Sequence, residues 1–294
     1  MIYFLQYCAL LPLIGLARLL PVGVSSWIAR RFGDLVFWLL PGRRRIALEN
    51  VDKAFGDSLA TPEKGRIARA AFQNAALSMT ELFIVEKIKK EAARRFTLTG
   101  NEHLEEAFAK QKGVVLVISH LGSWEYLSFL PFLTGRRWSV IVKEIKNPYL
   151  DNAVNALRRV MTVNPVEKLS SIRLVLQQLK EGNGVAILID QWAGDEGLWI
   201  DFFGTETSTT SIPVRLAEKT GCALVPGCCL RAAAGRYEIR LGKAIAPDLN
   251  RSDWENVTTQ QLNEVLEKEI QKYPEQWLWG HRRWKGKPDI VRNA

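Results

Sequence analysis

The sequence predicts an α/β fold: a single α/β/α-layered domain with a mostly parallel or mixed central sheet, plus an N-terminal hydrophobic anchor helix. From about residue 96 onward, short and nearly continuous apolar runs alternate with helix-like stretches. This alternation is typical of buried parallel strands that are joined by covering helices. The chain has 294 residues, which suits one large α/β domain with a full core. The apolar N-terminal segment supplies the anchor.

This first segment, residues 1–20, carries no charged side chain before Arg18. An apolar run of this length is at the lower limit for crossing a bilayer, and Pro12 and Gly15 weaken the helix. No basic residue precedes the run and no small-residue cleavage site follows it, so a cleavable signal peptide is not indicated. A buried core helix is the alternative. Because the basic residues come after the run, we expect an anchor in the inner (cytoplasmic) membrane, with the rest of the chain on the cytoplasmic face.

A second apolar cluster, residues 35–40, ends at Pro41 and is followed by three arginines at 43–45. Such a segment can lie in the headgroup plane while its arginines reach lipid phosphates. The ten tryptophans and the net charge of +9 also favour a membrane surface and an acidic partner. The sequence therefore divides into N-terminal membrane anchor and interfacial helices (1–47) and a catalytic domain (48–294).

The remaining elements follow in order along the chain. A helix is predicted from Thr61, with this threonine as its cap and Pro62 in its first turn, toward Leu82. The strand-like runs are 114–119, 139–143, 185–190, 223–228 and 237–241. The helix-like runs are 124–134, 148–160, 169–180, 212–220 and 257–272. No internal repeat or low-complexity tract is present, so a second folded domain is not indicated.

His120 directly follows the first strand-like run, and Glu125 lies five positions later. On one helix this spacing would place the two side chains about 140° apart. We therefore expect His120 at a strand end, Gly122 in a turn, and Glu125 in the next helix, which Ser123 would cap. Both side chains then face the crevice above the strand ends, where His120 could act as a general base and Glu125 could hydrogen-bond its ring. The alternative is a structural histidine at a strand end.

Two further stretches carry polar residues of interest. Asp190 ends another apolar strand and is followed by Gln191, which places the carboxylate on the same edge as His120; a helix cap is the alternative. Residues 274–285 combine three tryptophans with basic side chains, which suits an anionic and partly apolar surface. A solvated basic tail is the other interpretation. Nucleic acid would also fit, but the basic residues cluster at the two membrane-like ends of the chain, so it is not an expected partner.

Several chemistries lack their sequence signatures. The chain has no G-x-S-x-G elbow, no G-x-x-x-x-G-K-[S/T] loop and no G-x-G-x-x-G turn after a strand. Its histidines, His103, His120 and His281, are scattered, and no helix carries paired metal ligands. We therefore expect neither a serine hydrolase nor a nucleotide-binding protein, and neither a metal centre nor a cofactor.

In this combination and order, the segments resemble the lipid A biosynthesis acyltransferases, the lauroyl- and myristoyl-transferring branch of the lysophospholipid acyltransferase superfamily. The resemblance covers nearly the whole chain, and the His-x4-Glu motif gains specificity from the segments around it. The matching segments are Arg45 to Asn50 with Ala54 and Phe55, Asn74 to Glu81, His120 to Glu125, Asn147 and Pro148, Asp190 and Gln191, Phe202 to Gly204, and Gln276 and Trp277 through His281 to Lys285.

The resemblance implies a lysophospholipid acyltransferase-like fold and a membrane-associated O-acyltransferase of lipopolysaccharide biosynthesis. It implies acyl-carrier protein or acyl-CoA as the donor, a lipid A precursor as the glycolipid acceptor, and contact with the phospholipid surface. His120 becomes the catalytic base and Glu125 its partner. The implied substrate-binding residues are Arg158, Arg159, Asp190, Gln191 and Arg283.

One departure from the family pattern concerns the acceptor. Val142, Lys143 and Glu144 stand where many members have Tyr-Arg-Pro. This leaves open the same chemistry on another glycolipid or glycerolipid, such as a phosphatidylinositol mannoside. A membrane-binding module that has lost catalysis is the alternative from another functional class.

Overall fold

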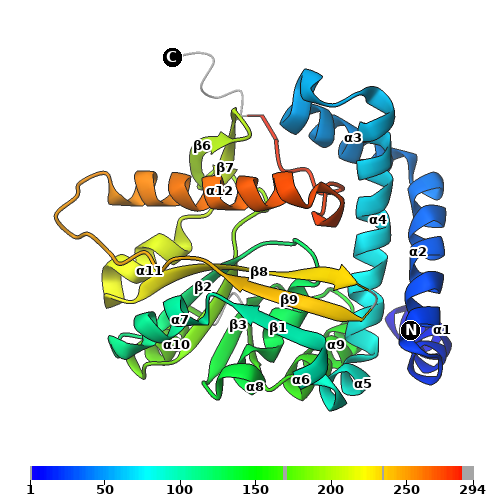
Figure 1. The fold of residues 1–294 in the computed structure, drawn as a ribbon, viewed down its shortest axis with the longest axis horizontal. Helices are drawn as coiled ribbons and strands as arrows, with labels where there is room; N and C mark the ends of the chain where they lie inside the picture. The colour runs from blue at the N-terminus through cyan, green and yellow to red at the C-terminus, as the bar shows by residue number, and fades with distance from the viewer. Residues whose placement is uncertain (1, 168–170, 234, 287–294) are drawn as a thin grey trace.

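The computed structural model describes residues 2–167, 171–233 and 235–286 and confirms the layered α/β fold (Figure 1). Its centre is a seven-stranded sheet with the order β1-β9-β8-β2-β5-β3-β4. Every neighbouring pair in it is parallel except β8 and β9, so the sheet is mixed, as expected. Its strands are β1 (Phe96–Thr99), β2 (Val114–Ile118), β3 (Trp138–Val142), β4 (Asn164–Glu167), β5 (Gly184–Leu188), β8 (Ala223–Ala233) and β9 (Arg236–Leu241).

The five predicted strands are all present, and the strands that the sequence did not predict are peripheral. β1 and β4 form the two edges of the sheet and have only four residues each. β4 also contains Pro165, a residue that sheets tolerate at their edges. A separate antiparallel hairpin is made by β6 (Leu198–Phe202) and β7 (Thr205–Thr209).

Helices cover both faces of the sheet. Leu116 and Ile118 of β2 belong to one apolar cluster and Val115 and Val117 to another, because successive side chains of a strand point to opposite faces. The first face carries α7 (Asn101–Ala109), η2 (Trp124–Phe129), α8 (Leu130–Thr134) and α9 (Pro148–Val160). The second face carries α10 (Ser171–Lys180), α11 (Ile212–Thr220) and α12 (Trp254–Lys272).

The predicted helices agree with these elements apart from their ends. The run 124–134 begins as a 3-10 helix, η2, before it becomes α8. Of the run 169–180, residues 169 and 170 lie outside the described part of the chain, and α12 begins at Trp254 rather than at 257. Three short helices complete the body: α5 (Val85–Lys90), α6 (Ala92–Arg95) and η3 (Pro274–Gln276).

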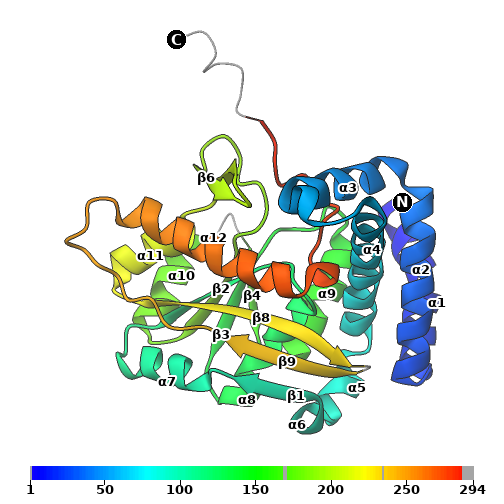
Figure 2. The ribbon, with the colours of Figure 1, turned by 45° about the horizontal axis from the view of Figure 1, so that its top comes forward.

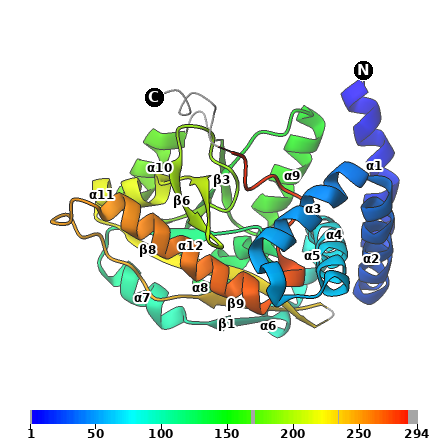
Figure 3. The ribbon, with the colours of Figure 1, turned by 90° about the horizontal axis from the view of Figure 1, so that it is seen from above.

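The N-terminal helices lie at one side of the body formed by the central sheet and its covering helices. They are α1 (Ile2–Leu19), α2 (Val22–Leu39), α3 (Pro41–Phe55), η1 (Gly56–Ser58) and α4 (Thr61–Phe83). Figures 1 and 2 show α2 running alongside α4, and in Figure 3 α1 extends from α2 toward the N-terminus. Ala60, not Thr61, occupies the cap position of α4, and no side chain caps this end. Residue 47, where the sequence suggested a boundary, lies inside α3.

Two details of this region bear on function. Gly33 of α2 lies so close to α4 that an added Cβ would fall on the backbone of Gln73, which makes α2 an integral part of the body. α1 is the one helix in the described residues that is long and apolar enough to cross a membrane, by length and composition alone. Pro12 does not interrupt it.

Candidate active site

The site begins where two neighbouring parallel strands end. β2 and β5 pair up to Ile118 and Leu188, so the polar residues that follow each strand meet at one edge of the sheet. The His120 backbone N–H donates to Asp190 Oδ2 at 2.8 Å, and the ring Nδ1 lies 2.9 Å from Asp190 Oδ1. The prediction that His120 and Asp190 share an edge is confirmed.

Asp190 is held as an anion in the protein interior. Its side chain is 2% exposed, and Oδ2 also accepts a hydrogen bond from Trp277 Nε1 at 2.9 Å. Burial raises the pKa of the Asp190 carboxyl, but the positive charge on His120 and the hydrogen bonds from His120 and Trp277 outweigh it. The pKa of Asp190 is therefore below its usual value, and the carboxylate stays charged near neutral pH.

His120 is arranged to act as a base. Burial lowers its pKa, yet the carboxylates of Asp190 and Glu125 outweigh burial and raise the pKa above the usual 6.5. With its proton on Nδ1 toward Asp190, the neutral ring keeps a lone pair on Nε2. His120 lines the cavity at this edge, and Gln191 Nε2 lies 3.5 Å from the ring Nε2.

The expected hydrogen bond between His120 and Glu125 is replaced by another pair. Glu125 accepts from Arg158 Nε at 3.0 Å and from Arg158 Nη2 at 2.7 Å. Asp190 already occupies the ring Nδ1, and η2 directs Glu125 toward α9 instead. Glu125 therefore acts on the imidazole through its charge. Ser123 occupies the N-cap position of η2, as expected, but its hydroxyl makes no capping hydrogen bond and donates to Glu81 at 2.8 Å instead.

The two adjacent arginines of α9 have different surroundings. Arg158 is largely buried and lines the cavity, whereas Arg159, one position further along the helix, is exposed to solvent. Arg158 Nη1 also donates to Asn155 Oδ1 at 3.0 Å. The sequence did not single out Asn155; its position three residues before Arg158, on the same helix face, was the available signal.

Arg283 does not lie where a substrate could reach it, which corrects its prediction as a substrate contact. The side chain is wholly buried and donates to the backbone oxygens of Gln191 at 3.1 Å and Ser208 at 2.7 Å. A third bond, at 2.6 Å, goes to Thr209 Oγ1. Burial lowers the pKa of Arg283 to about 10, and the guanidinium holds together the segments that follow Asp190.

Two tryptophans of the C-terminal stretch also lie in the core, whereas Arg282 and Lys285 are exposed. Trp277 and Trp279 are 1% and 0% exposed, which contradicts a surface-binding role for them. His281 accepts from the Trp192 backbone N–H at 3.3 Å, and burial lowers its pKa to about 4, so this ring is neutral. A stretch of aromatic and basic residues has the same composition in a core as on a surface, so its sequence could not distinguish them.

A cavity of about 630 Å³ opens beside His120. Its lining includes Glu125, Arg158 and Gln191 near His120, a group that we call its mouth, and a larger set of apolar side chains that includes Trp138. The described strands explain its shape: β3 and β5 pair only as far as Val140 and Ala186, whereas β2–β5 and β3–β4 pair to their ends. The sheet therefore opens between β3 and β5, and side chains from both of its faces line the cavity. These include Val140, Val142 and Leu188 from one face and Ile141 and Ile187 from the other.

No group of three or more His, Cys, Asp or Glu side chains suited to a metal ion occurs among residues 2–167, 171–233 and 235–286. The polar groups at the mouth include an imidazole, a carboxylate, a guanidinium and an amide, and the buried Asp190 carboxylate pairs with the imidazole. Such a set can move a proton and stabilise developing charge at the opening of an apolar cavity.

Comparison with known proteins gives a consistent result. The family model for "Bacterial lipid A biosynthesis acyltransferase" matches residues 1–286. A lipid A biosynthesis palmitoleoyltransferase of Escherichia coli (strain K12) is 26% identical over 279 residues, covering 92% of this chain and 87% of that protein. A lipid A biosynthesis acyltransferase of Haemophilus influenzae is 23% identical, over 67% of this chain and 61% of that protein. A phosphatidylinositol mannoside acyltransferase of Mycolicibacterium smegmatis is 22% identical, over 62% of this chain and 60% of that protein.

Proposed function

The chain belongs to the bacterial lipid A biosynthesis acyltransferase family, and on this premise we propose that it transfers a fatty acyl chain from an acyl thioester to a hydroxyl group of a lipid A precursor. The observation that carries the proposal is the His120–Asp190 pair at the mouth of an apolar cavity of about 630 Å³. A cavity of this size suits a small ligand such as a fatty acyl chain. The base then lies where the acyl carbonyl would emerge.

In the proposed reaction, His120 Nε2 takes the proton of the acceptor hydroxyl, and the oxygen attacks the thioester carbonyl carbon. The tetrahedral intermediate collapses with cleavage of the C–S bond, and the imidazolium returns its proton to the leaving sulfur. The products are an ester and a free thiol. Asp190 fixes the ring tautomer and stabilises the imidazolium, and general-base assistance of this kind is worth about 10²–10⁴ in rate.

We propose that Glu125, Arg158 and Gln191 stabilise the charges of the substrates and of the transition state at the mouth of the cavity. Arg158 lines the cavity, and its bidentate pairing with Glu125 holds the guanidinium beside the reacting groups. It can contact an anionic substrate group such as a phosphate. Gln191 has its amide close to His120 and can donate to the oxygen on which negative charge develops.

Membrane association is the second part of the proposal, with the N-terminal helices on the cytoplasmic face of the inner membrane. α2 buries Ala29, Gly33 and Phe37 against the body, yet it exposes a second apolar face. The large side chains on that face recur at helical spacing: Val24 43%, Trp27 63%, Ile28 39%, Leu35 51% and Trp38 61% exposed. Tryptophans with neighbouring arginines suit a boundary between acyl chains and anionic headgroups. α1 also exposes large apolar side chains, among them Ile2, Leu5 and Leu13.

The acceptor has a second candidate, a phosphatidylinositol mannoside. Lys143 lines the mouth of the cavity at the position where the sequence departs from the family pattern. A similar protein of Mycolicibacterium smegmatis is a phosphatidylinositol mannoside acyltransferase. Both acceptors are glycolipids with an anionic phosphate, so the chemistry at His120 is the same.

The test is product mass. Purified protein in detergent is incubated with acyl-carrier-protein or CoA thioesters of defined chain length and with each acceptor. We expect a new ester on the lipid A precursor, absent with folded His120→Ala protein. Transfer only to the mannoside would favour the second acceptor. No transfer from either donor to either acceptor, or an undiminished rate in the His120→Ala protein, would refute the proposal.

A further inference from the structure

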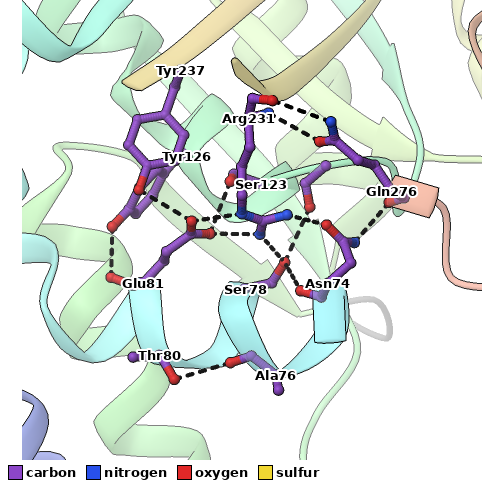
Figure 4. Close-up of polar contacts among 11 residues, drawn as sticks. Asn74, Ala76, Ser78, Thr80, Glu81, Ser123, Tyr126, Arg231, Tyr237 and Gln276 are labelled. Carbon is purple, nitrogen blue, oxygen red and sulfur yellow. Dashed lines mark hydrogen bonds and ion pairs between the residues drawn. The ribbon is translucent and has the colours of Figure 1, made fainter. Parts of the chain in front are cut away.

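A buried polar network, drawn in Figure 4, contacts Ser123 in the segment that joins His120 to Glu125. At its centre, Arg231 of β8 donates two hydrogen bonds of 2.7 Å to the carboxylate of Glu81 on α4. Both side chains are almost fully buried, 10% and 5% exposed, respectively. The guanidinium also donates to Asn74 Oδ1 and, at 2.7 Å, to Ser78 Oγ.

The network contacts two residues of the joining segment and one residue just after it. Ser78 Oγ donates to the backbone oxygen of Gly122 at 3.1 Å. Ser123 Oγ donates to Glu81 Oε2 at 2.8 Å. The hydroxyl of Tyr126, the residue after Glu125, donates to the backbone oxygen of Glu81 at 2.8 Å. α4 therefore holds the segment through its side chains and through its own backbone.

Backbone hydrogen bonds to two further residues hold the same segment. The backbone N–H of Gly122 donates to Gln276 at 2.8 Å, and that of Ser123 donates to Cys229 at 2.7 Å. The Gln276 side chain is itself paired with the backbone of Arg231, by bonds of 3.0 and 3.2 Å. Gly122 has a φ of +66°, and a Cβ there would collide with the carbonyl oxygen of Cys229. The backbone at Gly122 and Ser123, between His120 and Glu125, is thus held by several independent contacts.

A buried ion pair contributes little net stability, because desolvation of the two charges offsets their attraction. What this pair supplies is a fixed set of acceptors and donors for the joining segment. We propose that Glu81 and Arg231 are positioning residues that hold Glu125 at its distance from the His120 imidazole through Ser123 and Ser78. This inference rests on the proposed function only in taking His120 as the base.

Two single-hydroxyl variants test it. Ser123→Ala removes the bond to Glu81 Oε2, and Tyr237→Phe removes the 3.1 Å bond that Tyr237 donates to Glu81 Oε1. Both residues are buried, and both hydroxyls bind the same carboxylate, but Tyr237 has no hydrogen bond to the joining segment. We expect a similar fall in melting temperature for both. We expect kcat to fall about tenfold, with KM within about twofold, only in Ser123→Ala, since misplacement of reacting groups is costly.

A second readout does not depend on turnover. The charged groups around the imidazole are Asp190, Glu125 and its partner Arg158, and the neighbouring His281 is neutral. If Ser123→Ala releases Glu125, the His120 pKa measured by NMR of ¹⁵N-labelled histidine should fall, while Tyr237→Phe should leave it unchanged. Equal effects of the two variants on kcat and on this pKa, or no effect of either, would overturn the proposal. A wild-type protein without transferase activity would instead refute the proposed function, and the titration would still decide the positioning role.

Discussion

His120 Nδ1 lies 2.9 Å from Asp190 Oδ1, although 70 positions separate the two residues in the chain. The pair exists because β2 and β5 are parallel neighbours and both end at the same edge. Glu125, although near in sequence, binds Arg158 instead. A structural dyad of His120 and Asp190, assisted by the charge of Glu125, therefore replaces the simple His120–Glu125 pair.

The first prediction concerns Asp190→Asn. In the proposed mechanism the rate depends on neutral His120, so we expect activity to fall as the pH drops through the His120 pKa, which lies above its usual 6.5. Loss of the Asp190 charge lowers that pKa and moves the acid limb of kcat/KM to lower pH, while kcat falls about 10²–10⁴-fold. A pH profile of the folded variant checks this. An acid limb at the wild-type position would show that Asp190 does not set the basicity of His120.

The second prediction concerns the indole that donates to Asp190. Trp277→Phe removes the N–H that lowers the Asp190 pKa, so the dyad should retain its proton to higher pH and the acid limb should move upward. Loss of a bond to a buried acceptor costs about 1–3 kcal/mol of stability.

Trp279→Phe is the matched control for this change. Trp279 is equally buried and packs against Trp277, but its own indole donates to the Pro274 backbone oxygen at 2.7 Å and not to the dyad. We expect comparable destabilisation of the two variants in urea unfolding, with a shifted pH profile only for Trp277→Phe. A shift of the same size in both variants would mean that Trp277 acts only through general packing.

The sequence was sufficient to predict which residues end strands but not which strands are neighbours. His120 and Asp190 each follow a continuous apolar run, and this pattern is local. In the sheet, β5 lies between β2 and β3, and this strand order is a property of the whole sheet. For this reason the local candidate, Glu125, was expected to bind the ring, and the distant Asp190 was expected only on the same edge.

The sequence also could not predict which charged and aromatic side chains are buried. Arg283 and Trp277 belong to a stretch whose composition suggested a surface, yet both are almost completely buried. Arg283 donates hydrogen bonds to backbone oxygens, and Trp277 donates one to Asp190. These acceptors lie far away in the sequence. The Glu81–Arg231 pair is similar, because its members come from α4 and β8. The four-residue edge strands β1 and β4 gave too short a pattern to be predicted.

The third prediction concerns acyl-chain length. Ala186 lines the cavity at the point where β3 and β5 separate, so Ala186→Leu places three added carbons in the cavity. The preferred chain should become shorter, and each displaced methylene should cost about 0.8 kcal/mol, or about fourfold in kcat/KM. Competition between thioesters of different lengths measures this.

Ala223→Leu is the control for that variant. Ala223 is 2% exposed in β8 and packs in the core cluster on the same face as Ala186, but it does not line the cavity. Overpacking there should cost about 1–3 kcal/mol of stability without changing chain preference. An unchanged preference in Ala186→Leu would show that the acyl chain does not enter between β3 and β5.

The last prediction places α2 at the membrane surface. Because Gly33 packs α2 closely against α4, its outer face cannot turn away without disrupting the body, so membrane contact through Trp27 and Trp38 would fix the orientation of the whole protein. Nitroxide labels at Trp27→Cys and Trp38→Cys, in a Cys8→Ser background and in anionic vesicles, should report oxygen-accessible positions about 5–10 Å below the headgroups. Leu249→Cys is the control, since Leu249 is 68% exposed but lies in the loop before α12. Labels at all three positions with the same aqueous accessibility would exclude α2 from the membrane contact and leave α1 as the remaining candidate.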